Sequence, residues 1–125
     1  MLNDEQETRD LKQRTKLFAL RVIRLYSSLP AIGAAGVIGR QLLRCGTSVG
    51  AQYREAARAR SAAEFISKIE SATQELDESL YWMELLEESE LVARHLLADL
   101  KQEAVELTRI FVSSALTAKK NKGDA

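Results

Sequence analysis

Four stretches of this chain carry apolar or small residues at alternating spacings of three and four, and this repeat restricts the fold more than any other feature. Such spacing places the side chains on one face of an α-helix, whereas a half-buried strand would alternate at every second residue. The repeated positions are Leu11, Thr15, Phe18, Val22, Leu25 and Leu29; Ile38, Leu42, Cys45, Val49, Tyr53 and Ala56; Phe65, Ile69, Ala72, Leu76, Leu80, Met83 and Leu86; and Leu96, Leu100, Ala104, Leu107, Phe111 and Ser114.

Breaks between the four stretches set the expected helix ends. Pro30 and the glycines that follow it form the strongest break, and the polar run EESE at residues 87–90 indicates a second turn. Ser61 and Glu64 have the spacing of a capping box, in which the Ser61 hydroxyl accepts from the Glu64 amide and the Glu64 carboxylate accepts from the Ser61 amide. We therefore predict helices over about residues 5–28, 36–59, 62–87 and 93–118, with a frayed tail at 119–125.

Four long amphipathic helices with short connections are typical of an all-α, up-down-up-down antiparallel four-helix bundle. The chain has 125 residues, of which 46% are hydrophobic, and this suits a single domain with its own core over residues 1–125. No run approaches the roughly 20 apolar residues that cross a bilayer, and the first residues are charged where a signal peptide is apolar. We expect a cytoplasmic protein that does not bind membranes.

The sequence offers little for catalysis or for a metal. Cys45 lies on the apolar face of its helix, which favours a buried structural thiol, and His95 is most simply a surface residue. One cysteine and one histidine are too few for an ordinary zinc site, and a di-iron bundle site would need a second histidine. GAAGVIG at residues 33–39 fits neither nucleotide-binding glycine motif. We expect no cofactor, no metal and no enzymatic activity.

Charge is unevenly distributed although the formal net charge is zero. Residues 1–60 carry 11 basic and 5 acidic side chains, while residues 61–125 carry 7 and 13. The helical stripe at positions 40, 44, 47, 51, 54 and 58 contains four arginines, with a fifth just beyond it: Arg40, Arg44, Arg54, Arg58 and Arg60. These arginines could contact nucleic-acid phosphates without reading bases, or they could form ion pairs with the acidic third helix of the same or a neighbouring subunit.

Gly46 and Gly50 lie inside the expected second helix, where each costs roughly 1 kcal/mol relative to alanine. Their spacing predicts a smooth strip against which another backbone packs closely, within the bundle or across a subunit boundary. A kink or a flexible point is the alternative explanation.

The segments GTSVGAQYREAARARSAAEF and ESATQELDESLYWMELL together resemble the bacterial four helix bundle protein family. That family includes proteins encoded in intervening sequences of 23S ribosomal RNA genes and the accessory variability protein of diversity-generating retroelements. Gln52 departs from the pattern, since the family more often has asparagine there. The resemblance rests on Arg44, Ser48, Tyr53, Arg54, Glu55, Ala56, Ser61, Glu64, Phe65, Lys68, Ala72, Glu75, Glu78, Tyr81 and Trp82.

The resemblance implies a four-helix bundle that assembles into a ring-like homo-oligomer, a homopentamer. It also implies RNA or DNA as a partner, and a reverse transcriptase as a further partner if the gene belongs to a retroelement. A basic second helix and an acidic third helix on one subunit suit a head-to-tail contact that closes a ring. A purely structural or protein-docking oligomer, with its arginines in interface ion pairs, is the alternative.

Overall fold

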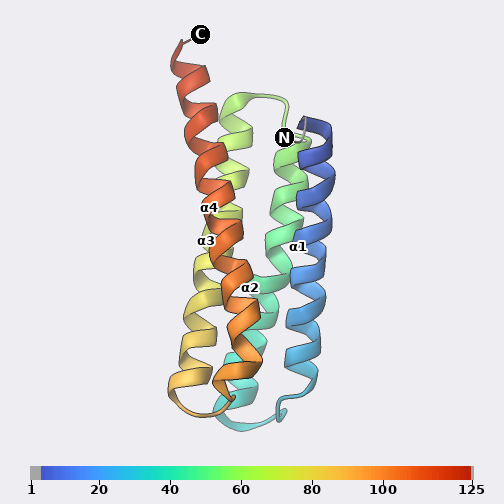
Figure 1. Ribbon diagram of the computed structural model, residues 1–125, viewed down its shortest axis with the longest axis vertical. Helices are drawn as coiled ribbons and strands as arrows, with labels where there is room; N and C mark the ends of the chain where they lie inside the picture. The colour runs from blue at the N-terminus through green and yellow to red at the C-terminus, as the bar shows by residue number, and fades with distance from the viewer. Residues whose placement is uncertain (1–3, 125) are drawn as a thin grey trace.

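The computed structural model describes residues 4–124 as four helices with no strand among them. Figure 1 shows the helices side by side, each running opposite to the one before it. The helices are α1 (Asp4–Ser27), α2 (Gly33–Ala57), α3 (Ala62–Glu88) and α4 (Arg94–Asp124). The predicted all-α, four-helix fold is therefore confirmed. None of the described helices has a stretch apolar and long enough to cross a bilayer.

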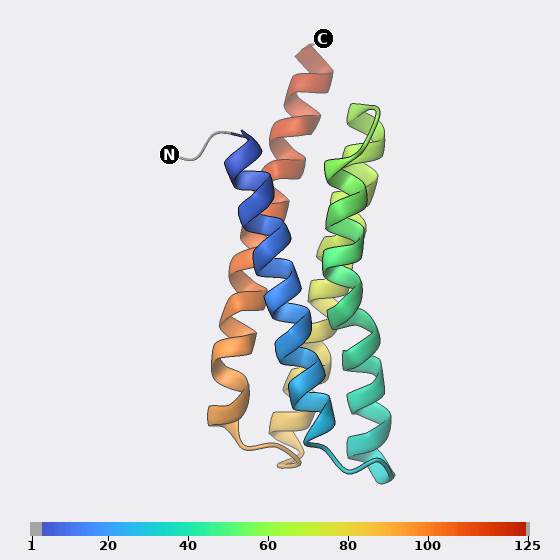
Figure 2. The ribbon, with the colours of Figure 1, turned by 90° about the vertical axis from the view of Figure 1, so that its right-hand side faces the viewer.

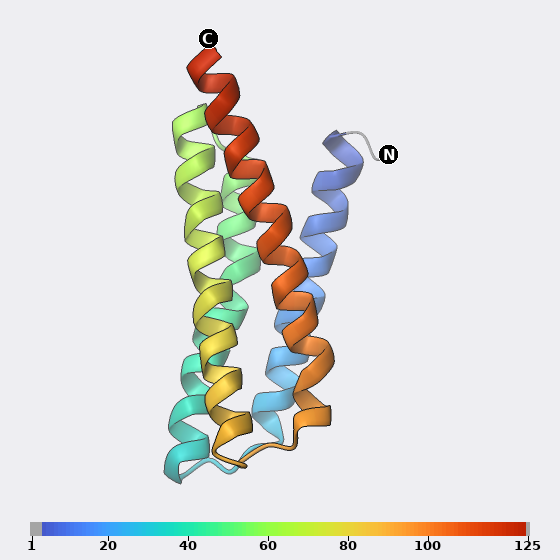
Figure 3. The same cartoon turned by 60° about the vertical axis from the view of Figure 1, so that its left-hand side comes forward.

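Consecutive helices pack together along their lengths, whereas α1 and α4 make few contacts with each other. Figures 2 and 3 show why: α4 leans toward α3 as it rises, so its C-terminal end separates from the N-terminal half of α1. The bundle is therefore open along one seam, between its first and last helices.

Two helix ends differ from the sequence prediction by three residues or more, and the others agree within two. α2 begins at Gly33, which has a φ of 76°, rather than at 36. The connection folds back over the first turn of α2, so a Cβ at Gly36 would lie 2.5 Å from the Ala31 carbonyl oxygen. α4 remains helical to Asp124 rather than ending at 118, and Lys119 in this extension pairs with Glu70 of α3 at 2.9 Å. The last predicted tail residue, 125, lies outside the described residues.

The corner between α2 and α3 contains the predicted cap with one change. The Ser61 hydroxyl accepts from the Glu64 amide at 3.1 Å, as the capping box requires. The Glu64 carboxylate, however, accepts from the amide of Arg60 at 3.1 Å, one residue earlier than predicted. The prediction that it binds the Ser61 amide is therefore wrong, and the cap fixes the backbone of Arg60 instead.

The core follows the predicted apolar faces, with a correction at the start of α4. Leu96 was placed on the buried face, but it is 61% exposed, whereas Leu97 is fully buried. Leu97 continues the spacing of Leu100, Ala104 and Leu107 and lies on the buried face of the helix. The adjacent Leu96 therefore faces the solvent. The side chains with no exposure include Phe18, Val22, Leu42, Cys45, Val49, Ile69, Ala72, Leu76, Met83, Leu86, Leu97, Ala104, Leu107 and Phe111.

Glycines allow α1 and α2 to approach closely. A Cβ at Gly46 would lie 2.8 Å from Val22 Cγ2, and a Cβ at Gly50 would lie 3.2 Å from Thr15 Oγ1. α2 is helical without interruption from Gly33 to Ala57. The glycines therefore serve close packing inside the bundle, which was one of the two predicted explanations, and no break in α2 accompanies them.

Candidate nucleic-acid interface

The five candidate arginines are all exposed, but they do not form one continuous row. Arg40 lies near the start of α2, where its Nη1 donates to the Ala31 carbonyl at 3.2 Å. Arg54 lies about 21 Å further along the helix at 1.5 Å per residue. The stripe therefore separates into Arg40 near the start of α2 and a group at its end. Arg44 lies between them and nearer to Arg40.

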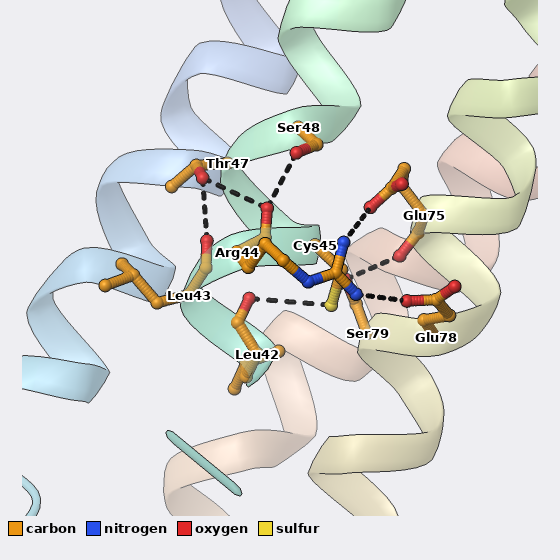
Figure 4. Close-up of polar contacts among 9 residues, drawn as sticks. All are labelled: Leu42, Leu43, Arg44, Cys45, Thr47, Ser48, Glu75, Glu78 and Ser79. Atoms are coloured by element: carbon orange, nitrogen blue, oxygen red, sulfur yellow. Dashed lines mark hydrogen bonds and ion pairs between the residues drawn. The ribbon is translucent and has the colours of Figure 1, made fainter. Parts of the chain in front are cut away.

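Arg44 forms ion pairs within its own chain. Its Nη2 donates to Glu78 Oε2 at 2.7 Å, and its Nη1 lies 3.7 Å from Glu75 Oε2 (Figure 4). The hydrogen bond that Arg44 donates to Glu78 is the main reason that the pKa of Arg44 is raised. For this arginine the ion-pair alternative holds, because its charge joins α2 to α3.

The cluster around Arg44 continues into the core. Burial raises the pKa of Glu75, Glu78 raises it further, and Arg44 opposes both effects. Beneath Arg44, Cys45 accepts a hydrogen bond from the Ser79 hydroxyl, with oxygen and sulfur 3.3 Å apart (Figure 4). Burial raises the pKa of the Cys45 thiol, which keeps it protonated and unreactive. This cluster can hold two helices together, but it has no reactive group open to a substrate.

Arg54, Arg58 and Arg60 differ from Arg44, because none of their side chains forms an ion pair with the described side chains of residues 5–123. The nearest acids in the sequence are already occupied. Glu55 pairs with Lys68 at 3.1 Å, and Glu64 accepts from the Arg60 amide. Three exposed guanidinium groups thus gather where α2 ends and α3 begins, with their charge uncompensated.

The remaining residues that carry the family resemblance mostly support the α2–α3 pair. Tyr53 is buried and stacks on Phe111 of α4, with ring centroids 5.4 Å apart. Trp82 packs edge-on to the exposed Tyr81 at 5.2 Å. Ser48 donates to the Arg44 carbonyl at 2.7 Å, and Phe65 is half-buried at the start of α3. These contacts fix the helices that present the three free arginines.

The open seam between α1 and α4 holds a cleft of about 670 Å³. Leu11, Tyr53, Phe65 and Ile110 give it an apolar floor, and hydroxyl groups from α1 and α4 line its sides. Burial raises the pKa of the Tyr53 hydroxyl, which contacts Thr8. Within residues 4–124 no cluster of histidine, cysteine and acidic side chains could hold a metal ion. The sequence analysis did not find this cleft, because it depends on the angle between two helices far apart in the chain.

Sequence reasoning also passed over cations on α1. Lys12 and Lys16 were not among the candidate residues, yet neither forms an ion pair with a described residue. A signal was present in the sequence: residues 11–54 contain no aspartate or glutamate. An acid-free run across two helices indicates a basic surface shared by both.

Comparison with known proteins agrees with the fold and the quoted motifs. A protein of unknown function from the S23 ribosomal protein family of Bacteroides thetaiotaomicron has a crystal structure that matches with a TM-score of 0.78 and 33% identity, covering 86% of this chain and 96% of that one. No curated protein matches the chain significantly. The family model for the 23S rRNA-intervening sequence protein matches residues 7–113. The chain therefore belongs to the 23S rRNA-intervening sequence protein family.

Proposed function

We propose that this chain forms a homo-oligomer, a pentamer by its family resemblance, that acts in the cytoplasm as a non-enzymatic scaffold and binds RNA or DNA phosphates. The observation that carries the proposal is the group Arg54, Arg58 and Arg60, three exposed arginines at one corner with no acidic partner among the described residues. Arg44 drops out of the proposed contact set because Glu75 and Glu78 use its charge.

Guanidinium groups suit this role because each presents several donors in a plane that matches two phosphate oxygens. The Ser61 cap supports them by fixing the backbone that carries Arg60. A homo-oligomer would repeat the corner on every subunit, so that weak phosphate contacts act together at high effective concentration. The names of the family and of its structural neighbour both refer to ribosomes, which favours RNA as the first probe.

A protein-docking oligomer is the second candidate, and unpaired acids favour it. Asp77, Glu84 and Glu88 are exposed on α3 and form no ion pair with described residues. A neighbouring subunit could bring its free arginines against these carboxylates in a head-to-tail contact. In that case the arginines would hold the oligomer together, and nucleic acid would have no free site at this corner.

Charge reversal separates the two candidates. We expect Arg54→Glu with Arg58→Glu to abolish binding to a labelled RNA, because phosphates would meet carboxylates, while sedimentation still reports the wild-type oligomer. The matched control reverses Arg24 and Arg109, which are also exposed and form no ion pair with a described residue but lie elsewhere. If the Arg54 and Arg58 reversals dissociate the oligomer, the arginines are interface residues and the docking candidate replaces the proposal.

A further inference from the structure

α1 carries a second row of free cations. Arg9, Lys12 and Lys16 follow one another at helical spacing, which places them on one face of the helix. Arg9 and Lys16 are exposed, Lys12 is half-exposed, and none of them forms an ion pair with a described residue. Arg14 points elsewhere, because it donates to Glu103 of α4 at 2.6 Å. The row is therefore separate from the cation that ties α1 to α4.

The packing of α1 on α2 brings this row beside the free arginines. Thr15 lies against Gly50, as the 3.2 Å approach to its Oγ1 shows. Lys12 lies almost one turn before Thr15, and Arg54 lies one turn after Gly50. The two helices run in opposite directions, so both steps lead to the same end of the bundle (Figure 1). Lys12 and Arg54 therefore lie at about the same level on the two sides of the α1–α2 seam.

The same register extends the surface in both directions. Lys16 lies level with the small, exposed Ala51, and Arg9 lies level with Arg58 near the end of α2. Glu5 lies one turn before Arg9 on the same face of α1, at the end of this surface, but the acids beside its middle point away from it. Asp10 acts on Arg14 and so lies on the α4 side, and Glu55 is held by Lys68 at 3.1 Å. Five cations on two helices thus share one surface, and none of the acids with described side chains lies between them.

The side chains of this surface distinguish between single-stranded and double-helical nucleic acid as its partner. Proteins that hold single strands combine basic grooves with aromatic side chains on which bases stack. Tyr53 and Phe18, the aromatic residues of this half of α1 and α2, are buried. Among the described residues the exposed aromatic is Tyr81, on α3, which does not pack against α1. The surface therefore offers phosphate contacts and no stacking platform.

Two rows of cations suit a partner with two phosphate backbones. Axes of closely packed helices lie about 8 Å apart, so long basic side chains from the two helices can reach phosphates on both sides of a groove. We propose that Arg9, Lys12, Lys16, Arg54 and Arg58 form one α1–α2 basic surface that binds a double-helical nucleic acid through the phosphates of both strands.

This inference rests on the proposed function, so its test distinguishes a failure of the inference from a failure of the proposed function. The probes are a labelled RNA duplex of about 20 base pairs and one of its strands alone, each titrated over a series of salt concentrations. The variant is Lys12→Gln with Lys16→Gln. The matched control, Arg24→Gln with Arg109→Gln, removes the same charge from exposed, unpaired positions outside the surface.

We expect the wild type to bind the duplex more tightly than the strand. The lysine variant should reduce the slope of log K against log salt by about 1.8 for the duplex, at the value of about 0.9 for each lost phosphate contact that holds for double-helical DNA. The control should keep the wild-type slope. If the lysine variant matches the control while the Arg54 and Arg58 reversals abolish binding, the inference is wrong and the proposed function stands. Equal affinity for strand and duplex overturns the duplex assignment, and no binding by the wild type overturns both proposals.

Discussion

Glu75 shows how one residue decides what a basic stripe can do. Its carboxylate is largely buried, with 18% of the side chain exposed, and its Oε2 accepts no hydrogen bond. The Arg44 guanidinium, 3.7 Å away, favours the ionised form and so opposes the rise in the pKa of Glu75 that burial causes. Arg44 therefore compensates the charge of a buried acid. The sequence pattern places Arg44 on a basic helical stripe and does not reveal this role.

A pH dependence of stability follows from Glu75. Burial raises the pKa of this carboxyl above its ordinary value of 4.5, so the folded chain holds the proton more tightly than the unfolded chain. The stability that this residue contributes is present below pH 4.5 and is lost as pH rises through the raised pKa. We expect Glu75→Gln to gain stability relative to the wild type between pH 4 and pH 7, as measured by urea unfolding.

Arg44→Gln should change the dependence of folding stability on pH in the direction opposite to Glu75→Gln. Arg44 lowers the pKa of Glu75, so its loss raises that pKa further and deepens the decline in stability toward pH 7. If Glu75→Gln and Arg44→Gln each keep a constant difference from the wild type at both pH values, Glu75 is not the buried acid described above.

At the scale of helices, the tight packing of α1 on α2 depends on glycine. A Cβ at Gly46 would come within 2.8 Å of Val22, a fully buried and stiff side chain. We expect Gly46→Ala to lower the free energy of unfolding by about 1–2 kcal/mol, because overpacking outweighs the gain in helix propensity. Gly123→Ala, where the added Cβ meets nothing within 4 Å, is the control. A Gly46→Ala variant as stable as this control would contradict the account of the seam.

The sequence predicted the helices, but it did not predict the features that depend on how the helices pack against one another. Regular spacing identified all four helices and most of the core. Leu96 and Leu97 could not be distinguished, because both fit the helical period and only the orientation of α4 selects one. The early start of α2 depends on a connection that folds over Gly36. The ion pairs of Arg44 depend on the register of α2 against α3, which spacing along one helix does not reveal.

In the whole molecule, a net charge of zero conceals two unlike halves. The α1–α2 half presents free cations, while α3 presents free acids at Asp77, Glu84 and Glu88. The half-buried ion pair of Arg14 with Glu103 joins the halves across the seam between α1 and α4, and this leaves the outer charges available for partners. Such polarity gives a neutral protein a local attraction for phosphates.

The salt dependence of RNA binding tests the central claim most directly. The wild type and a variant with Arg54, Arg58 and Arg60 changed to glutamine would be titrated against the same RNA duplex, with sedimentation confirming equal oligomers. If these three arginines contact phosphates, the slope of log K against log salt falls by about 2.7 in the variant, at about 0.9 for each contact. An unchanged slope, or an oligomer that falls apart, would contradict the assignment of this corner to nucleic acid.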